Sequence, residues 1–402
     1  MHYAGGLLIR YLRCQILLTA PASLKEETDL KIRDFGVEIW LNDRENDCTY
    51  NLSDTCAVPL TVDELLEISG DREGVLKEIG DITLNYGDIT GSPRLKKAIS
   101  TLYKNVPAER ITTAHGAIGA NAIALMALVE PGDHVISIVP TYQQYYSLPE
   151  SIGAEFTLLK LKEENNWLPD LDEIRAAMRP DTKVICINNP NNPTCALMDA
   201  DMLKAIADIA SESSAYLFCD EAFRGLNFEG ESLSPSAIDI YEKAIVTGSM
   251  SKTLSLAGLR LGWIAGPQDI IDTINIHRDY HIISTGRIDE LLASVAIENK
   301  DAIFARNTAA CREKVAYIAE WIEKEPHYSF VRPHTGTTCF IKFDMDMTSE
   351  ELCHRLQHEA GVLFVPGAAF ECDDHFRLGF GNDLETIKAG LDALSEWTKK
   401  NF

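Results

Sequence analysis

Short apolar runs alternate with amphipathic stretches through the central part of the chain. Seven such runs lie between positions 111 and 266: ITTAHG, HVISIVP, EFTLLKL, KVICINN, YLFCDE, AIVTGS and RLGWIAG. Their length and composition predict buried strands, and the stretches AIALMALVE and ADMLKAIADIASE between them have a helical period. Strands that alternate with helices predict an α/β fold with a mostly parallel sheet, whose ligands bind beyond the carboxyl ends of the strands.

The pattern changes after Pro267. Two helical stretches come first, STGRIDELLASVAIEN and ARNTAACREKVAYIAEWIEKE, and the second predicts a long amphipathic helix. The runs YSFVRPHTGTTCFIKFD, SEELCHRLQHEAGVLFVPGAAF and HFRLGFG then predict a strand, a helix and a strand. Before the seven central runs, we expect a strand at Tyr50–Leu52 and a helix that starts at Thr61, where Glu64 completes a capping box.

Composition narrows the class of protein. A chain of 402 residues with 46% hydrophobic content can bury a large core and exceeds most single domains. The net charge of -24 argues against a nucleic-acid or anionic-membrane partner. The ten cysteines form no C-x-x-C pair, and Cys186 and Cys219 lie in apolar runs. They predict buried free thiols in a reducing compartment, with neither a metal site nor a disulfide framework.

The N-terminal segment MHYAGGLLIRYLRCQILLTA contains two arginines and no acid. We expect an irregular extension before the fold, with a weak transit or signal segment as the alternative. No apolar run is long enough to span a bilayer, so we expect a cytoplasmic protein.

Lys252 has unusual neighbours for a lysine. It stands among Ser249, Ser251 and apolar residues after a predicted strand, without a nearby acid, and Arg260 follows eight positions later. A desolvated amine can condense with a carbonyl, while two serines and an arginine suit a phosphate. The alternative is an ordinary loop lysine.

Other candidate residues also follow predicted strands. Gly116 and Ala117 open a helix whose N-terminus could meet an anion, unless they form only a glycine turn. Asp220 ends an apolar strand, where a buried carboxylate needs a partner. Arg377 stands in the apolar run HFRLGFG, where its guanidinium suits a carboxylate ligand or a structural ion pair.

The pattern S-x-S-K, seven residues, then R-x-G-W resembles the cofactor-lysine segment of class I/II aminotransferases. These fold type I enzymes use pyridoxal 5′-phosphate. The resemblance implies a large domain with a mostly parallel seven-stranded sheet between helices, and a smaller α+β domain. We expect an irregular extension over residues 1–30, an arm belonging with the small domain over 31–60, the large cofactor-binding domain over 61–290, and the linking helix and small domain over 291–402.

The same resemblance assigns roles to residues. Lys252 would form the internal aldimine, Asp220 would contact the pyridinium nitrogen, and Arg377 would bind the substrate α-carboxylate. The cofactor phosphate would lie near the residues Gly116, Ala117, Ser249, Ser251 and Arg260. Tyr142 would stack on the ring, although alone it could be core filler, and Asn192, in N-P-T, would donate to the ring oxygen and help to place the carboxylate. Tyr86, five residues before Gly91, would reach the phosphate of a partner subunit, which implies a homodimer with shared active sites.

Two positions depart from the family pattern. Cys195 replaces the usual glycine of N-P-T-G, and Phe223 replaces a tyrosine whose hydroxyl bonds the ring oxygen. Losing that hydrogen bond costs about 1 kcal/mol, so the cofactor should still bind. Asp54 could face a ligand or be a solvated loop acid, and Arg287 could contribute to specificity or be an exposed basic residue.

We therefore predict an enzyme that moves an amino group between an L-amino acid and a 2-oxo acid. Phe223 and Asp54 keep open a lyase, cyclase or oxidase that acts on an amino acid such as arginine. A non-catalytic effector-binding member is a third possibility, which the retained Lys252, Asp220 and Arg377 disfavour.

Overall fold

The computed structural model describes residues 32–402, and residues Phe35–Phe402 form one compact unit. The expected extension over residues 1–30 lies outside the described residues, as does its alternative as a transit segment. Among the helices of the described part, none has both the length and the hydropathy needed to cross a membrane.

The seven expected strands form one sheet. Its order is β2-β8-β7-β6-β5-β3-β4. The bounds are β2 (Ile111–Ala114), β3 (His134–Val139), β4 (Glu155–Lys160), β5 (Thr182–Asn188), β6 (Tyr216–Asp220), β7 (Ala244–Ser249) and β8 (Gly262–Ala265). β8 runs antiparallel to both of its neighbours, and the other pairs are parallel. The prediction of a mostly parallel seven-stranded sheet is confirmed.

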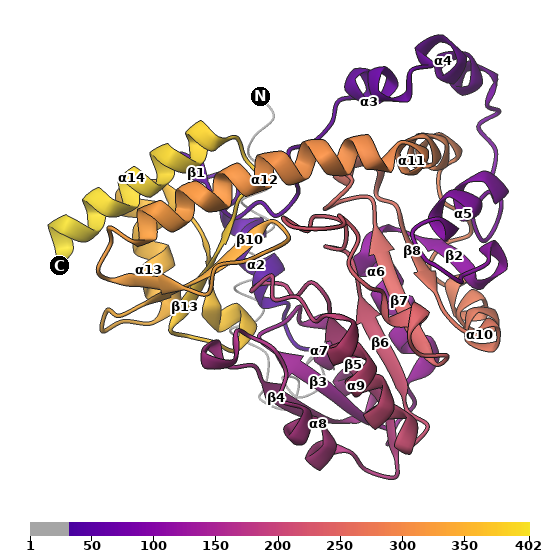
Figure 1. Ribbon diagram of the computed structural model, residues 1–402, viewed down its shortest axis with the longest axis horizontal. Helices are drawn as coiled ribbons and strands as arrows, with labels where there is room; N and C mark the ends of the chain where they lie inside the picture. The colour runs from indigo at the N-terminus through magenta and orange to yellow at the C-terminus, as the bar shows by residue number, and fades with distance from the viewer. Residues whose placement is uncertain (1–31) are drawn as a thin grey trace, which may run out of the picture. The chain divides into compact units, whose positions relative to one another are not determined.

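Continuous apolar runs form these strands because the sheet is covered on both faces. Along β6, Leu217 and Cys219 belong to one hydrophobic cluster, whereas Phe218, which points to the other face, belongs to a second cluster. The second cluster includes side chains of α6 (Gly116–Leu128), α7 (Gln144–Ile152) and α10 (Gln268–Arg278). α8 (Leu171–Ala177) and α9 (Ala200–Glu212) contribute to the first cluster and lie in front of the sheet in Figure 1. The helix predicted to open at Gly116 begins there and ends at Leu128.

The C-terminal part contains a second sheet, of order β12-β13-β10-β9, with antiparallel pairs. The strands are β9 (Tyr328–Phe330), β10 (Thr338–Phe343), β12 (Val365–Pro366) and β13 (His375–Gly379). α12 (Lys300–Ile322) runs from the end of α11 (Arg287–Glu298) toward this sheet, where it lies beside α14 (Leu384–Asn401) (Figure 1). In the sequence, α13 (Ser349–Arg355) follows β10 and precedes β11 (Val362–Leu363). The sequence pattern predicts α12 and α13, whereas α14 is a helix that we did not predict.

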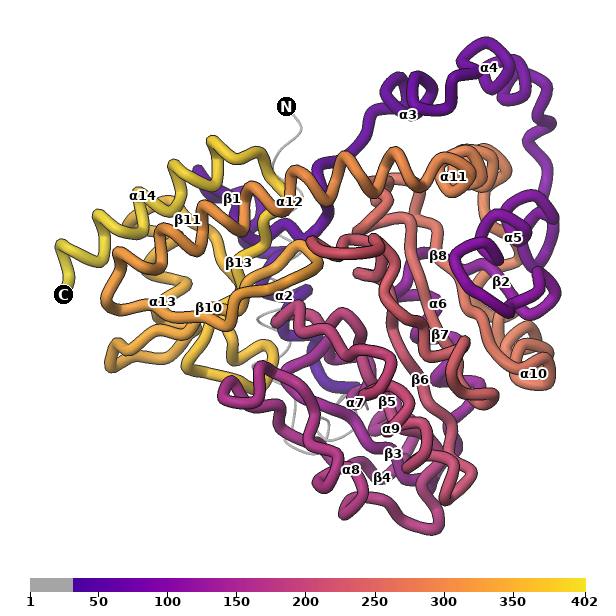
Figure 2. The backbone as a smooth tube through the Cα atoms, viewed as in Figure 1, coloured from indigo at the N-terminus to yellow at the C-terminus, as the bar shows by residue number. Residues whose placement is uncertain are grey.

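The N-terminal elements are distributed between these parts. α2 (Gly36–Arg44) precedes β1 (Tyr50–Asn51), which pairs in parallel with β11 (Val362–Leu363). α3 (Val62–Ser69) and α4 (Arg72–Asp81) follow, and Figure 2 shows them beyond α11, before the chain returns at α5 (Pro93–Ser100). The capping box at α3 is confirmed, because Thr61 Oγ1 accepts from the Glu64 amide at 3.1 Å and Glu64 Oε2 accepts from the Thr61 amide at 2.7 Å. The β1–β11 pair supports the placement of residues 31–60 with the small domain, and the domain boundaries stay a prediction.

Candidate active site

A cavity of about 450 Å³ lies beyond the carboxyl ends of the central strands. It is lined by residues from α2, from the loop after β1, from the ends of β5, β6 and β7, and from β13. Of the predicted site residues, those that line it are Ala117, Tyr142, Asn192, Asp220, Ser249, Ser251, Lys252, Arg260 and Arg377. Gly116 lies beside the cavity, and Tyr86 does not line it.

Lys252 follows β7 and extends its amine into this cavity. Nζ donates a hydrogen bond to Thr55 Oγ1 at 2.7 Å and lies 3.8 Å from Cys56 Sγ. The ring of Phe223 has its centroid 5.9 Å from the same nitrogen. No carboxylate of the described residues forms an ion pair with Lys252, so its neighbours are a hydroxyl, a thiol and a hydrocarbon face. This amine is available to a ligand in the cavity.

Asp220 ends β6 and is only 4% exposed. Its carboxylate accepts hydrogen bonds from Asn121 Nδ2 and Tyr145 Oη, both at 2.7 Å, and from the Ala222 amide at 2.8 Å. Burial raises the pKa of Asp220, and these donors oppose the shift. All three are neutral, and no described cation pairs with this carboxylate. A buried carboxylate that faces a cavity without a cation fits a cationic group of a ligand.

Asn121 and Tyr145 are site residues that the sequence reading missed. Thr247 Oγ1 donates to Asn121 Oδ1 at 2.6 Å, which turns the amide NH₂ of Asn121 toward Asp220. Asn121 is a single polar residue in the otherwise apolar helix α6, and this contrast was a usable signal. Tyr145 stands in the same short segment as Tyr142, and the sequence does not indicate which of the two tyrosines contacts Asp220.

The start of α6 and the loop after β7 form an anion cradle. Ser249 Oγ donates to Ser251 Oγ at 2.9 Å and accepts from the Ser251 amide at 3.0 Å. Gly116 has φ +67°, and a Cβ there would lie 3.1 Å from Arg260 Nη2. The glycine thus lets a guanidinium approach a helix N-terminus whose N-cap side chain makes no hydrogen bond. Two hydroxyls, a guanidinium and free helix amides are the donors that a phosphate needs.

Arg377 lies in β13 and is 3% exposed. Its Nη1 donates to Asn192 Oδ1 at 3.1 Å, and its Nη2 donates to the Ser53 carbonyl at 3.3 Å. Its Nε has no hydrogen-bond partner among the described residues. Burial lowers the pKa of Arg377 to about 10, although Glu38 opposes this shift. Because Asn192 Oδ1 accepts from Arg377, the Asn192 amide NH₂ remains a donor, and the pair suits a carboxylate.

Tyr142 is a cavity residue and not a core filler. Its hydroxyl donates to Glu38 Oε1 at 2.9 Å, and its ring centroid lies 4.9 Å from that of Phe35. Burial raises the pKa of Tyr142. Glu38 comes from α2, which the sequence reading did not predict, so nothing in the pattern indicated that this acid reaches the cavity.

Tyr86 and Arg287 lie outside the cavity. Tyr86 is 73% exposed, and its role toward a partner subunit stays a prediction. Arg287 donates to the Thr83 carbonyl at 2.8 Å and to Asn85 Oδ1 at 2.6 Å, close to Tyr86 in sequence. Arg287 is partly buried, and it fixes the loop that carries Tyr86; whether it contributes to specificity stays a prediction.

The two departures from the family pattern have different consequences. Cys195 has φ 53°, the left-handed conformation that favours glycine, and its Sγ lies 2.9 Å from Thr338 Oγ1. The turn after Asn192 therefore has the backbone conformation of a glycine. Phe223 is buried and brings no hydroxyl to the cavity.

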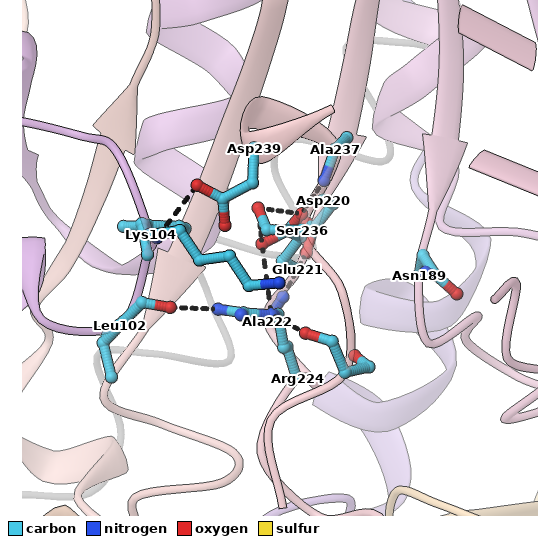
Figure 3. A network of polar contacts seen from close by, with 12 residues as sticks. Leu102, Lys104, Asn189, Asp220, Glu221, Ala222, Arg224, Ser236, Ala237 and Asp239 are labelled. Carbon is cyan, nitrogen blue, oxygen red and sulfur yellow. Dashed lines mark hydrogen bonds and ion pairs between the residues drawn. The ribbon is translucent and has the colours of Figure 1, made fainter. Parts of the chain in front are cut away.

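A polar network behind Asp220 fixes the turn that leads to Phe223 (Figure 3). Glu221 accepts from Ser236 Oγ at 2.7 Å and from the Ala237 amide at 2.9 Å. Arg224 lies 3.8 Å from Glu221 and donates to the Leu102 carbonyl at 2.8 Å. Burial raises the pKa of Glu221 to about 7, and Arg224 opposes the shift. Glu221 and Arg224, which flank the turn, are thereby each held by hydrogen bonds to a different segment of the chain.

Comparison with known proteins agrees with this geometry. Residues 46–394 match the family described as aminotransferase class I and II. The chain is 31% identical over 361 residues to capreomycidine synthase of Streptomyces vinaceus, with 90% of this chain and 92% of that protein covered. It is 27% identical over 335 residues to aspartate aminotransferase of Pyrococcus horikoshii, with 81% and 86% covered.

A solved structure is more similar still. The crystal structure of a PLP-dependent aminotransferase from Streptococcus suis 89-1591 superposes with a TM-score of 0.89 at 45% identity, and the match covers 92% of this chain and 98% of that one. The predicted fold type is thus confirmed. The chain belongs to the class I and II aminotransferases, enzymes that use pyridoxal 5′-phosphate to move an amino group between an amino acid and a 2-oxo acid.

Proposed function

We propose that Lys252, Asp220 and Arg377 are the reacting and binding groups of this aminotransferase. The observation that supports the proposal is that an amine, a buried carboxylate without a cation and a partly unpaired guanidinium face the same cavity. When bound, pyridoxal 5′-phosphate supplies an aldehyde for an amine and a protonated ring that withdraws electrons from the substrate Cα.

The cavity residues fit this cofactor. Asp220 offers its carboxylate to the ring nitrogen, and Tyr142 offers a ring face for stacking. The residues that would hold the phosphate are Gly116, Ala117, Ser249, Ser251 and Arg260. Arg260 can approach the start of the helix because Gly116 has no side chain. Any larger residue at this position would occupy the space between the helix start and the guanidinium.

In the reaction, Arg377 and Asn192 bind the substrate carboxylate and so orient the Cα–H bond. Lys252 would accept the Cα proton and later return it, and Thr55 Oγ1 accepts a hydrogen bond from the free amine and so orients it. Replacement of Lys252 by Ala should abolish transfer, and borohydride reduction followed by peptide mass spectrometry should find the cofactor on Lys252 in the parent protein. Recovery of the cofactor on another lysine would refute the assignment.

We also propose that the enzyme is a homodimer in the cytoplasm. Tyr86 and Leu84 are 73% and 83% exposed, which suits a loop that is covered by a second copy. Replacing Tyr86 by Phe should weaken cofactor binding without changing the mass measured by light scattering. A monomeric mass at micromolar concentration would contradict the shared site.

The cavity also points to a class of substrate side chain. Glu38 and Asp54 line it, and no cation of the described residues forms an ion pair with either carboxylate. Asp54 Oδ1 accepts from the Cys56 amide at 2.9 Å, and Glu38 holds Tyr142. An acidic side chain, such as that of aspartate, would meet both carboxylates, whereas a cationic one would neutralise them. The proposed substrate is therefore an L-amino acid with a cationic side chain, such as arginine.

The matched test uses arginine and its neutral relative norvaline. Replacing Glu38 by Gln or Asp54 by Asn should raise KM for arginine by about 10-fold or more and leave norvaline unchanged. Asp43→Asn is the control, because Asp43 lies on α2 next to Arg44 and does not line the cavity. Equal effects on both amino acids would exclude a role for these acids in side-chain selection.

A second candidate function is elimination, cyclisation or oxidation of the same amino acid. Phe223 favours it, because this position has no hydroxyl where the usual transaminases have a tyrosine, and capreomycidine synthase is among the relatives. A single turnover distinguishes the two. Transamination leaves pyridoxamine phosphate and one equivalent of 2-oxo acid, whereas the alternatives consume the amino acid without pyridoxamine phosphate. A protein that binds the cofactor and converts no amino acid would be a non-catalytic member.

A further inference from the structure

Three side chains with metal-binding atoms meet at the start of β13, away from the active-site cavity. Cys372, Asp374 and His375 each offer one atom, and these atoms lie within 4.8 Å of one another. None of the three lines the cavity. We propose that they form a binding site for a zinc-class divalent cation, with one coordination position open to water.

The distances between the donor atoms match a tetrahedral site at two of three edges. Cys372 Sγ lies 3.4 Å from His375 Nδ1 and 3.5 Å from Asp374 Oδ1. Typical Zn–S and Zn–N or Zn–O bonds in a tetrahedron require about 3.5 Å for both separations. His375 Nδ1 and Asp374 Oδ1 are hydrogen-bonded at 2.7 Å and must move apart to about 3.3 Å. A rotation of the exposed Asp374 side chain achieves this.

The histidine is held ready for coordination. Its ring stacks on Phe340 with centroids 4.7 Å apart and an interplanar angle of 15°, and the edge contact with Trp167 is at 5.1 Å. The ring is 2% exposed, and its Nε2 is buried without a hydrogen-bond partner in the described part of the chain. Glu163 Oε2 lies 3.8 Å from that nitrogen. Histidine ligands usually donate their second N–H to a carboxylate, and Glu163 is placed to accept it after a small movement toward Nε2.

The backbone of the turn is also fixed. The Cys372 amide donates to the Gly367 carbonyl at 3.0 Å, and the Phe343 amide donates to the Asp374 carbonyl at 3.1 Å. Because the ligands stand on a fixed turn, little conformational freedom is lost on binding. Binding replaces the thiol proton of Cys372, which goes to solvent, by the metal ion.

One neighbouring charge opposes the site. Lys342 Nζ lies 3.3 Å from Asp374 Oδ2 and 3.6 Å from Glu163 Oε2. It pairs with the carboxylate oxygen that the metal does not need and leaves Oδ1 for coordination. Its positive charge lowers the affinity for a cation. Replacing Lys342 by Gln should therefore strengthen zinc binding, by roughly two- to fivefold for a half-exposed charge.

The absence of paired cysteines predicts no metal site, because the usual zinc motifs contain C-x-x-C pairs. The motif here is C-x-D-H, in which only one residue is a cysteine, and its second carboxylate, Glu163, lies far away in sequence. The three ligands are local in sequence, and only the neighbouring carboxylate of Glu163 depends on how the turn after β4 packs against β13.

The test is zinc titration of the cofactor-loaded full chain after treatment with a chelator, under a non-thiol reductant. His354 and His358 have rings 4.3 Å apart on one helical turn and could bind zinc themselves, so every protein carries His358→Gln. We expect one zinc per chain, and cobalt should give thiolate-to-metal charge-transfer absorption. Cys372→Ser should weaken zinc binding by at least about tenfold and abolish that absorption. Cys48→Ser, which changes a comparably placed free thiol, should do neither.

Unchanged zinc affinity in Cys372→Ser, or no saturable binding in the His358→Gln parent, would overturn the proposal. Lys342→Gln gives a second, independent readout, because it retains all three ligands and changes only the opposing charge. Weaker binding in that variant would also contradict a cation site. Circular dichroism of each variant checks that the fold is retained.

Discussion

Replacing Asp220 by Asn should separate cofactor binding from the stability of the fold. Asparagine keeps the shape and can accept from Asn121 and Tyr145 through its carbonyl oxygen, which takes the place of Oδ2. Its amide NH₂ then faces the Ala222 amide, so one hydrogen bond is lost, at a cost of about 0.5–1.5 kcal/mol. The negative charge that faces the cavity is also removed.

These two effects have opposite consequences for the cofactor-free protein. Burial raises the pKa of Asp220, so the charged form of this carboxylate costs stability until a cation pairs with it. Asparagine relieves this cost and loses the bond to Ala222, so the free energy of unfolding without cofactor should stay within about 1 kcal/mol of the parent. A charge-assisted hydrogen bond contributes about 1.5–3 kcal/mol, which predicts an increase in the cofactor Kd of about 10- to 150-fold.

The assay pairs denaturant unfolding without cofactor with a fluorescence titration by pyridoxal 5′-phosphate. Asp239→Asn is the control, because Asp239 accepts from the Lys104 amide at 2.9 Å in the same region (Figure 3) and does not line the cavity. Unchanged cofactor affinity in Asp220→Asn, or an equal loss in Asp239→Asn, would refute the role given to the buried charge.

Three further predictions concern neighbouring groups. Because the pKa of Glu221 is raised to about 7, the folded protein keeps a proton that the unfolded chain has released. The free energy of unfolding should therefore fall by about 2 kcal/mol from about pH 5.5 to 8. Glu221→Gln should remove this pH dependence in denaturant unfolding. Phe223→Tyr should tighten cofactor binding by about 1 kcal/mol and shift its visible absorption, and no change in either would place the new hydroxyl away from the ring. Since the pKa of Arg377 is lowered to about 10, its guanidinium loses its charge above that pH, and the Kd for a 2-oxo acid should rise. An unchanged Kd at pH 11 would show that another cation binds the carboxylate.

The strands could be predicted because both faces of the large sheet are buried. The strands β3, β5 and β7 are mainly apolar runs, which can be recognised without knowledge of their neighbours. α2 was missed for the opposite reason. Its sequence, GVEIWLNDR, has no apolar stripe, and only Val37 and Trp40 are buried. Such a helix is stabilised by contacts with distant segments, among them the bond from Trp40 Nε1 to the Phe364 carbonyl at 2.8 Å.

The same distinction separates predicted from missed site residues. Asp220 and Lys252 follow strands that the pattern identifies, so their place at one edge of the sheet could be inferred. Thr55 and Cys56 reach Lys252 across almost two hundred residues of sequence, from a loop with no regular element. No local pattern indicates such a contact, because it depends on how the N-terminal segment packs over the cavity.

The reversed strand β8 explains how Arg260 reaches the anion cradle. In a purely parallel sheet, the residue before a strand lies at the amino ends of the strands, opposite the active site. β8 is antiparallel to β7, so its first residue, Gly262, pairs with the last residue of β7, Ser249, and Arg260 just before it comes to the carboxyl edge. β2 is antiparallel to β8 in turn, and its last residue, Ala114, also pairs with Gly262, which brings Gly116 and the start of α6 to the same place. The reversal of β8 thus brings the guanidinium to the hydroxyls and helix amides that follow β7 and β2, and the loop that makes the reversal carries Lys252.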